Sequence, residues 1–224
     1  MARFLAYAPC CAFVAILTAC GASQPPTGVS TGLQAERASF VRASDRFTAI
    51  YSFRGGSGDG AYPNGGLTVA YGVLYGTTAG GGPTGAGTIY EISPSGQESP
   101  IHIFAGAPDG DDPWPPPIRF NGGLYGTTAG GGANNLGAVF KIGRYGAERI
   151  VYSFQGGADG TQPIAGLMHY DGTLYGATLY GGANSDGTIF AIDRRGKERV
   201  LHSFGGSSDG ENRYTTLTAY DGVL

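Results

Sequence analysis

The chain repeats itself every 50 residues, and this repeat constrains its fold more than any other feature of the sequence. The tripeptide Leu-Tyr-Gly begins at Leu74, Leu124 and Leu174. Glycines and isoleucines recur at the same interval, namely Gly87, Gly137 and Gly187, and Ile92, Ile142 and Ile192. A fixed period of this length is the signature of an array in which each unit is one supersecondary structure that packs against its neighbours.

Each unit contains four strand signals. In the third unit they are residues 167–170, 173–178, 187–192 and 198–204. Asp171-Gly172 separates the first two, and Asp-Gly between two apolar segments is a strong hairpin signal. The equivalent dipeptides in the other units are Tyr71-Gly72, Asn121-Gly122 and Asp221-Gly222. Gly-rich loops, such as residues 80–82, are expected to turn the chain between the second and third strands. The composition of 42 Gly, 14 Tyr and 11 Phe also favours short strands and tight turns over helices.

These strands predict an all-β, β-propeller-like array of four-stranded antiparallel blades over residues 46–224, each of about the length of a kelch repeat. Complete units are expected at about residues 67–104, 118–154 and 167–204, and a partial unit at 217–224. Residues 47–53 match an isolated fourth strand. About 3.5 blades are fewer than the roughly four to eight of a closed ring, so we interpret the chain as a fragment. The alternatives are a short array that closes by oligomerising and an open stack of sheets.

The N-terminus has the pattern of a bacterial lipoprotein signal peptide at residues 1–19. Arg3 precedes an apolar stretch at residues 4–17, which is too short to span a membrane. The following Leu-Thr-Ala-Cys sequence predicts lipidation at Cys20, and residues 20–45 then form a flexible tether. We expect an exported lipoprotein, held by its lipid anchor at the outer membrane or cell surface. The alternative is an ordinary signal peptide, in which Cys20 is incidental.

Cysteine content and charge exclude several functional classes. All three cysteines lie in the N-terminal segment, at Cys10, Cys11 and Cys20, so the repeats contain neither a disulfide nor a thiol nucleophile. The formal net charge is -3, and the basic residues form no stripe. We therefore expect no nucleic-acid partner.

The repeat resembles a known family. Its pattern is L-Y-G-[TA]-T-x-x-G-G-x-x-x-x-G, then G-x-[IV]-[YF]-x-I, then [YH]-x-F-x-G-x-x-D-G, and it is similar to the bacterial GloVer repeat over roughly residues 47–224. In the second unit the pattern is carried by Leu124-Tyr125-Gly126-Thr127-Thr128, Gly137-Ala138-Val139-Phe140 and residues 152–160. The resemblance implies an exported, propeller-type array with varied anchoring and no established activity.

Acidic residues recur before glycine in each unit, at Asp59, Asp109, Asp159 and Asp209. We interpret them as turn-forming residues, because an Asp side chain accepts hydrogen bonds from the backbone of its own turn. A catalytic acid is needed once, whereas a turn is needed in every blade. Calcium would need about six to eight oxygen ligands, which one carboxylate per turn does not provide.

The histidines do not suggest a metal site. His102 and His202 occupy the position of Tyr51 and Tyr152 in other units, so we expect them to fill space on a strand. His169 lies at a variable position. We predict no metal, no cofactor and no catalytic residue.

A ligand site should lie where the units differ. One connection between units contains Asp111, Asp112 and Trp114, the only Trp of the chain. The loops of the third unit add three further candidates, Tyr180, Asn184 and Asp186. An exposed Trp would give a stacking surface for a sugar or a peptide. The alternative is that Trp114 packs between neighbouring blades.

These features predict a surface-anchored, non-enzymatic repeat scaffold that binds a protein or carbohydrate ligand. The first alternative is a propeller-type carbohydrate-active enzyme, for which Asp111, Asp112 and Asp186 are the candidate acids. The second is a purely structural envelope protein without a specific ligand.

Overall fold

The computed structural model describes residues 48–144, 146–205, 209 and 216–219. The chain divides at residue 46, and the described residues all belong to the unit Phe47–Leu224. The predicted signal peptide, the tether and Cys20 lie outside them. Within the described part, no helix has the length and apolar character needed to cross a membrane.

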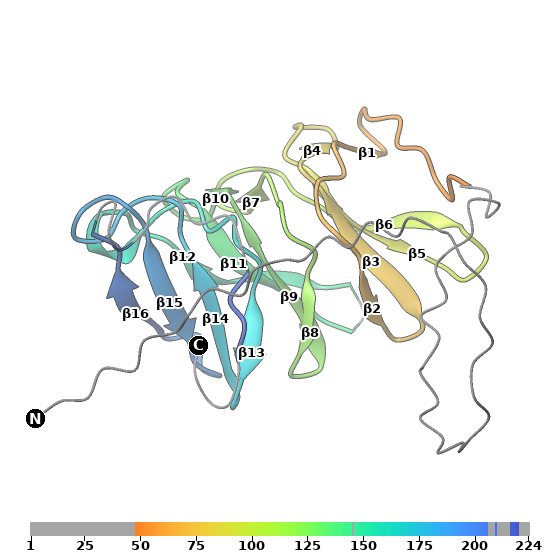
Figure 1. Ribbon diagram of the computed structural model, residues 1–224. Helices are drawn as coiled ribbons and strands as arrows, with labels where there is room; N and C mark the ends of the chain where they lie inside the picture. The colour runs from red at the N-terminus through yellow and green to blue at the C-terminus, as the bar shows by residue number, and fades with distance from the viewer. Residues whose placement is uncertain (1–47, 145, 206–208, 210–215, 220–224) are drawn as a thin grey trace, which may run out of the picture. The chain divides into compact units, whose positions relative to one another are not determined.

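Three four-stranded antiparallel sheets make up most of the described fold (Figure 1). We call them blades 1 to 3. Blade 1 contains β2 (Thr68–Ala70), β3 (Val73–Thr78), β5 (Thr88–Ile92) and β6 (Glu98–Ile103). Blade 2 contains β8 (Ile118–Phe120), β9 (Gly123–Thr128), β11 (Ala138–Ile142) and β12 (Glu148–Ser153). Blade 3 contains β13 (Met168–Tyr170), β14 (Thr173–Ala177), β15 (Thr188–Ile192) and β16 (Glu198–Ser203).

Neighbouring strands in each blade are also neighbours in the chain, which is the up-and-down order of a propeller blade. No sheet runs from one blade into the next among the described residues. The prediction of an all-β, propeller-like array of four-stranded blades is confirmed.

The first two strands of each blade are joined by the predicted hairpin turn. Its first central residue has a positive φ in all three blades, at Tyr71 (51°), Asn121 (42°) and Asp171 (43°). The glycine that follows also has a positive φ, between 72° and 82°. Positive φ at both central positions defines the type I′ turn, whose twist matches that of the flanking strands.

The Gly-rich loops do more than turn the chain, which corrects the simpler expectation from the sequence. β4 (Gly80–Gly81) pairs with β1 (Gly60–Ala61), and β10 (Gly130–Gly131) pairs with β7 (Gly110–Asp111). In the third unit a single bridge, Thr161 to Tyr180, replaces this ladder, and a short 3-10 helix, η1 (Gly157–Asp159), precedes it. Gly81 and Gly131 are required because the backbone of the paired segment lies where their Cβ would be.

Within each blade an aromatic ring on the third strand lies over a glycine on the second strand. Phe140 of β11 is paired with Gly126 of β9, and a Cβ on Gly126 would overlap the ring. Gly76 with Tyr90 and Gly176 with Phe190 repeat the arrangement. The glycine of each Leu-Tyr-Gly motif therefore gives the ring its space.

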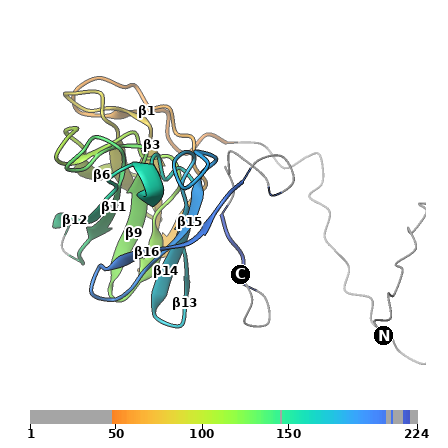
Figure 2. The same cartoon turned by 90° about the vertical axis from the view of Figure 1, so that its left-hand side faces the viewer.

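The blades pack face to face through pairs of aromatic rings, and Figure 2 views the sheets one behind another. Phe104 and Phe154, each directly after the last strand of a blade, are fully buried. Phe154 meets Phe190 of the next blade edge to face, with ring centroids 5.1 Å apart. Because these rings recur every 50 residues, the same aromatic contact forms at each boundary between blades.

The segments at the two ends of the described region are not hydrogen-bonded into sheets. Residues 48–53 form no strand, although the Phe53 ring still packs against Tyr90 at 4.8 Å. Residues 216–219 also form no strand, and the rest of the predicted partial unit, residues 220–224, lies outside the described residues. The sequence predicted residues 48–53 as the fourth strand of a blade. The described part of the chain contains no third strand for them to pair with, so of the contacts of a fourth strand only the aromatic one is made.

Candidate functional site

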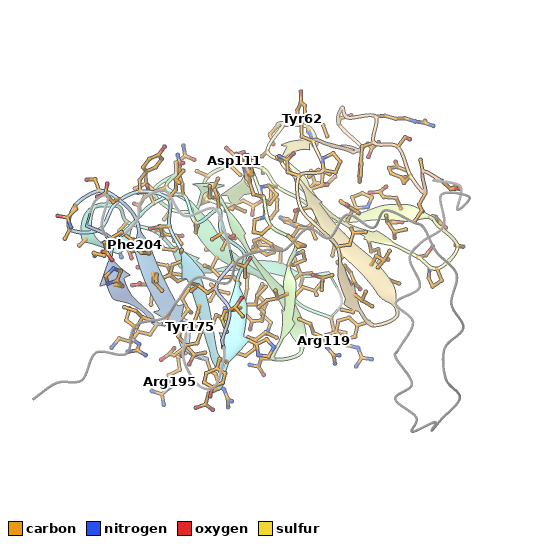
Figure 3. The ribbon with its side chains drawn as sticks, viewed as in Figure 1. Tyr62, Asp111, Arg119, Tyr175, Arg195 and Phe204 are labelled. Carbon is orange, nitrogen blue, oxygen red and sulfur yellow. The ribbon has the colours of Figure 1, made fainter. Side chains whose placement is uncertain are left out.

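A pocket of about 430 Å³ lies at the end of the blades where the short ladders form. Figure 3 shows Asp111 at this end, together with Tyr62, whereas Arg119 and Arg195 lie at the opposite end with the hairpins. We call this cavity the Trp114 pocket. It is lined by Asp111, Asp112, Trp114, Ala129, Gly130, Asn135, Gln162, Ile164 and Leu179. The lining therefore comes from the units of blades 2 and 3.

Local backbone structure positions the two carboxylates. Asp111 ends β7 and pairs with Gly130, where a Cβ would lie 3.2 Å from the Cβ of Asp111. Asp112 has a φ of 57°, donates its N–H to Ala86 O at 2.9 Å and accepts the N–H of Ala129 at 3.0 Å. Because Asp tolerates a positive φ better than most residues, this strained position suits it.

The Trp114 main chain is attached to blade 1, while its indole remains partly open to solvent. Thr77 Oγ1 of β3 donates to the carbonyl oxygens of Trp114 and Pro115, both at 3.2 Å. Thr127 Oγ1 donates in the same way to Ala165 O at 3.4 Å, so this attachment is part of the repeat. The indole is not part of the repeat, and Trp114 is 40% exposed. The backbone of Trp114 is thus fixed to blade 1, while its indole is not buried between the blades.

The electrostatics of the pocket are acidic. Burial, and then the neighbouring charge of Asp112, raise the pKa of Asp111 above its ordinary value. The lining includes no Lys, Arg or His. Asn135 and Gln162 add neutral polar side chains, and Ile164 and Leu179 add apolar surface.

The structure brings together only half of the predicted ligand-binding residues. Asp111, Asp112 and Trp114 share the pocket, whereas Tyr180, Asn184 and Asp186 are not among its lining residues. Tyr180 is 46% exposed and directly follows Leu179, which does line it. Asn184 Nδ2 donates to Phe204 O at 3.1 Å, and Asn134 makes the same bond to Phe154 O. Asp186 forms a backbone bridge with Gly181.

The sequence did not predict Asn135 or Leu179 as site residues. Gln162 and Ile164 stand 50 residues after Asp112 and Trp114, so they hold the equivalent positions in the next connection, but this spacing does not show that the two connections share a pocket.

The repeated aspartates close the turns that follow the last strand of each blade. Asp159 Oδ2 accepts the N–H of Gln155 at 2.7 Å, and its Oδ1 accepts the Tyr152 hydroxyl at 3.0 Å. Asp59 has the equivalent partners, the N–H of Arg54 at 2.7 Å and the Tyr51 hydroxyl at 3.2 Å.

The same contact corrects the interpretation of two histidines. His102 Nε2 lies 3.3 Å from Asp109 Oδ2, and His202 Nε2 lies 2.9 Å from Asp209 Oδ2. These rings are polar partners of the aspartates and do not merely fill space. Tyr and His exchange at this position because each places a hydrogen-bonding atom at the tip of a ring.

A recurring glutamate escaped the sequence analysis. Glu98, Glu148 and Glu198 begin the last strand of their blades, and Oε1 of each is buried without a hydrogen-bond partner. Burial raises the pKa of all three, and the nearby aspartate of the preceding turn adds to the shift. For Glu198 the pKa rises to about 7. The 50-residue spacing of these glutamates was visible in the sequence. The spacing alone does not show that each glutamate lies close to an aspartate.

The opposite end of blades 2 and 3 holds a groove of about 570 Å³. It is lined by Arg119, Phe120, Asn121, Gly122, His169, Gly172 and Arg194. His169 lies at the variable position that the sequence indicated, with its ring 5.5 Å from that of Phe120. The groove lacks the combination of carboxylates and indole found in the Trp114 pocket.

The described fold defines a class of protein: an all-β repeat array of equivalent four-stranded blades. The family model of the Gloeobacter/Verrucomicrobia repeat matches residues 30–224, and the chain belongs to this family. The resemblance found in the sequence is thereby confirmed, and the match begins inside the predicted tether. No curated protein matches the chain.

Proposed function

We propose that this chain is an envelope-anchored binding module, and that its Trp114 pocket takes a carbohydrate. The observation that carries the proposal is the meeting of one half-exposed indole with two carboxylates and two amides in a single cavity. An aromatic face stacks on the C–H groups of a sugar ring, while carboxylate and amide oxygens accept its hydroxyl protons.

Size and charge favour a neutral sugar. Ligand pockets generally measure about 300–1,000 Å³, and a cavity of about 430 Å³ fits one or two sugar rings. The carboxylates of Asp111 and Asp112 repel anionic ligands, since no cationic side chain lines the pocket. A peptide ligand is the alternative, and it would use the same indole.

The test uses the fluorescence of Trp114, the only Trp in the chain. An array of neutral and acidic glycans and of peptides identifies a ligand, and a fluorescence titration then measures its affinity. We expect a neutral glycan to shift the emission, and Trp114→Ala to abolish binding on the array. Tyr170→Ala removes a similarly exposed ring outside the pocket and should bind as the native chain does.

Two results would count against this function. Binding of peptides alone would replace the carbohydrate with a protein ligand. Absence of binding to any glycan or peptide would favour a purely structural envelope component.

The anchoring part of the proposal rests on the sequence of residues 1–20. Cys20 would carry the lipid after cleavage behind Ala19. In a bacterial host grown with a labelled fatty acid, the native chain, Cys10→Ser and Cys11→Ser should take up the label, whereas Cys20→Ser should not. Labelling of the Cys20→Ser variant would refute lipidation at Cys20.

Asp111 supports a second candidate function, a carbohydrate-active hydrolase. Its raised pKa, next to the carboxyl group of Asp112, suits a general acid. If the chain hydrolyses the glycan that it binds, Asp111→Asn should abolish turnover and leave binding intact. Asp186→Ala should keep full activity, because Asp186 does not line the pocket. Binding without turnover would favour the non-enzymatic module.

A further inference from the structure

Three potential metal ligands meet at the boundary between blades 1 and 2. His102 comes from β6, Asp109 from the turn after it, and Glu148 from β12. One ligand atom of each residue lies within 4.8 Å of the other two. All three side chains are partly buried; His102 and Asp109 are seven residues apart in the sequence, whereas Glu148 lies 39 residues beyond Asp109.

The distance between the His102 and Asp109 ligand atoms suits a tetrahedral metal ion. His102 Nε2 and Asp109 Oδ2 are 3.3 Å apart, which is long for a charge-assisted hydrogen bond. The related pair His202 and Asp209 is separated by 2.9 Å. Two ligands bound at about 2.1 Å to one tetrahedral Zn²⁺ lie roughly 3.4 Å apart, close to the distance between His102 and Asp109.

The polar atoms of the cluster are incompletely satisfied. Asp109 Oδ1 and Glu148 Oε1 are buried and have no hydrogen-bond partner. A buried oxygen of an ionised carboxylate without a partner is costly, and two such groups facing each other repel. A divalent cation would remove both penalties, because it binds carboxylate oxygens directly.

The equivalent positions at the boundary of blades 2 and 3, and between residues 48–61 and blade 1, show what is special about this site. Each has the same aspartate and glutamate, namely Asp59 with Glu98 and Asp159 with Glu198. There, however, the ring belongs to a tyrosine, Tyr51 or Tyr152, which donates its hydroxyl proton to the aspartate. Neutral tyrosine is a poor metal ligand, whereas imidazole is the commonest one in proteins. Only the boundary of blades 1 and 2 thus combines a nitrogen ligand with both carboxylates in the described part of the chain.

We propose that His102, Asp109 and Glu148 bind a divalent transition-metal ion such as Zn²⁺ and thereby join blade 1 to blade 2. Three protein ligands leave the fourth position of a tetrahedral ion to water. The imidazole selects a first-row transition metal over Ca²⁺ and Mg²⁺, which prefer oxygen ligands only. The site departs from the expectation of no metal, because Glu148 lies 39 residues beyond Asp109 and the sequence does not bring them together.

Calorimetric titration of the full chain, freed of metal by chelation, with Zn²⁺ tests the proposal. We expect one site with a dissociation constant in the micromolar range, and a rise in Tm when Zn²⁺ is added. Co²⁺ bound in its place should show the visible absorption of a tetrahedral site. Titration with Ca²⁺ should show no binding at the same concentrations.

His102→Tyr is the most informative variant, because tyrosines, Tyr51 and Tyr152, already occupy the equivalent position in two other repeats and the fold should persist. We expect Zn²⁺ binding to weaken more than about 10-fold, since loss of even an outer-shell partner costs about that much. His202→Tyr removes a histidine from the same position of the next repeat and should bind as the native chain does. Tyr152→His, which sets an imidazole beside Asp159 and Glu198, should add a second Zn²⁺ site.

Failure of the native chain to bind Zn²⁺ at about 100-fold above the expected dissociation constant would overturn the proposal. Unchanged affinity in a folded His102→Tyr variant would do so equally, because the ion would then sit elsewhere. Neither outcome bears on the Trp114 pocket.

Discussion

The ring of Phe104, directly after the last strand of blade 1, packs edge to face against the ring of Phe140 in blade 2, with centroids 5.3 Å apart. Both side chains are fully buried. Edge-to-face packing sets the positive edge of one ring against the negative face of the other, and such pairs add about 0.5–1.5 kcal/mol beyond area burial. The same edge-to-face contact recurs between Phe154 and Phe190, so it helps to hold each pair of adjacent blades together.

Phe140→Ala should lower the free energy of unfolding by about 3–5 kcal/mol, because it removes a buried ring and leaves a cavity. Urea denaturation followed by circular dichroism measures the change. Tyr170→Ala, which truncates an exposed ring, should change stability by no more than about 0.5 kcal/mol. A loss below about 1 kcal/mol in Phe140→Ala would show that the ring does not hold the blades together.

Gly126→Ala should destabilise the chain by about 1–3 kcal/mol, since the new methyl group would overlap the ring of Phe140. Gly66→Ala is the matched control, because nothing lies within 4 Å of its Cβ position and its φ is not positive. It should be neutral or slightly stabilising. Chemical denaturation of both variants makes the comparison, and equal effects would mean that the ring does not require the glycine.

The free energy of unfolding should fall as the pH rises from about 4.5 to about 7, because Glu198 loses its proton in this range. Burial first, and then Asp159, raise the pKa of Glu198 to about 7 in the folded chain, above its ordinary 4.5. Between these values the folded state binds more protons than the unfolded state, so the stability that protonated Glu198 confers at low pH is lost as pH rises. After allowance for solvent screening, the contribution is on the order of 1–2 kcal/mol.

Glu198→Gln should remove this part of the pH dependence and be more stable than the native chain at pH 8. Thermal unfolding at pH 5 and pH 8 provides the measurement. Asp171→Asn, an acid-to-amide change in a hairpin turn that accepts either residue, should leave the pH dependence unchanged. An identical pH profile in Glu198→Gln would refute the assignment.

Tyr152→Phe should cost about 1 kcal/mol, because it deletes the 3.0 Å hydrogen bond from the tyrosine hydroxyl to Asp159. Asp159→Ala should cost more, about 1–3 kcal/mol, since it also leaves the N–H of Gln155 without its acceptor. A double-mutant cycle measures the coupling between the two side chains. Simple additivity would indicate that the tyrosine does not support the turn.

Local chemistry in the sequence was sufficient to predict the architecture. The 50-residue period located the blades, and Asn121-Gly122 and Asp171-Gly172 predicted the hairpins, because these dipeptides adopt positive φ readily. The short ladders were missed, since glycines such as Gly81 and Gly131 permit either a turn or a strand.

The sites were only partly predictable. The break in symmetry at Trp114, Asp111 and Asp112 was visible as a departure from the repeat. The residues that complete the pocket were not connected with it, because Asn135 and Leu179 come from loops whose meeting depends on blade packing.

The sequence by itself determined the strand pattern, the turns and the repeat, because each depends on residues that are neighbours in the chain. Tertiary structure alone decided that His102 and Asp109 would meet Glu148, and that Trp114 would share a cavity with Gln162. The physical reason is that contacts across blades depend on the relative placement of adjacent sheets, which arises from the packing of buried rings and not from spacing along the chain.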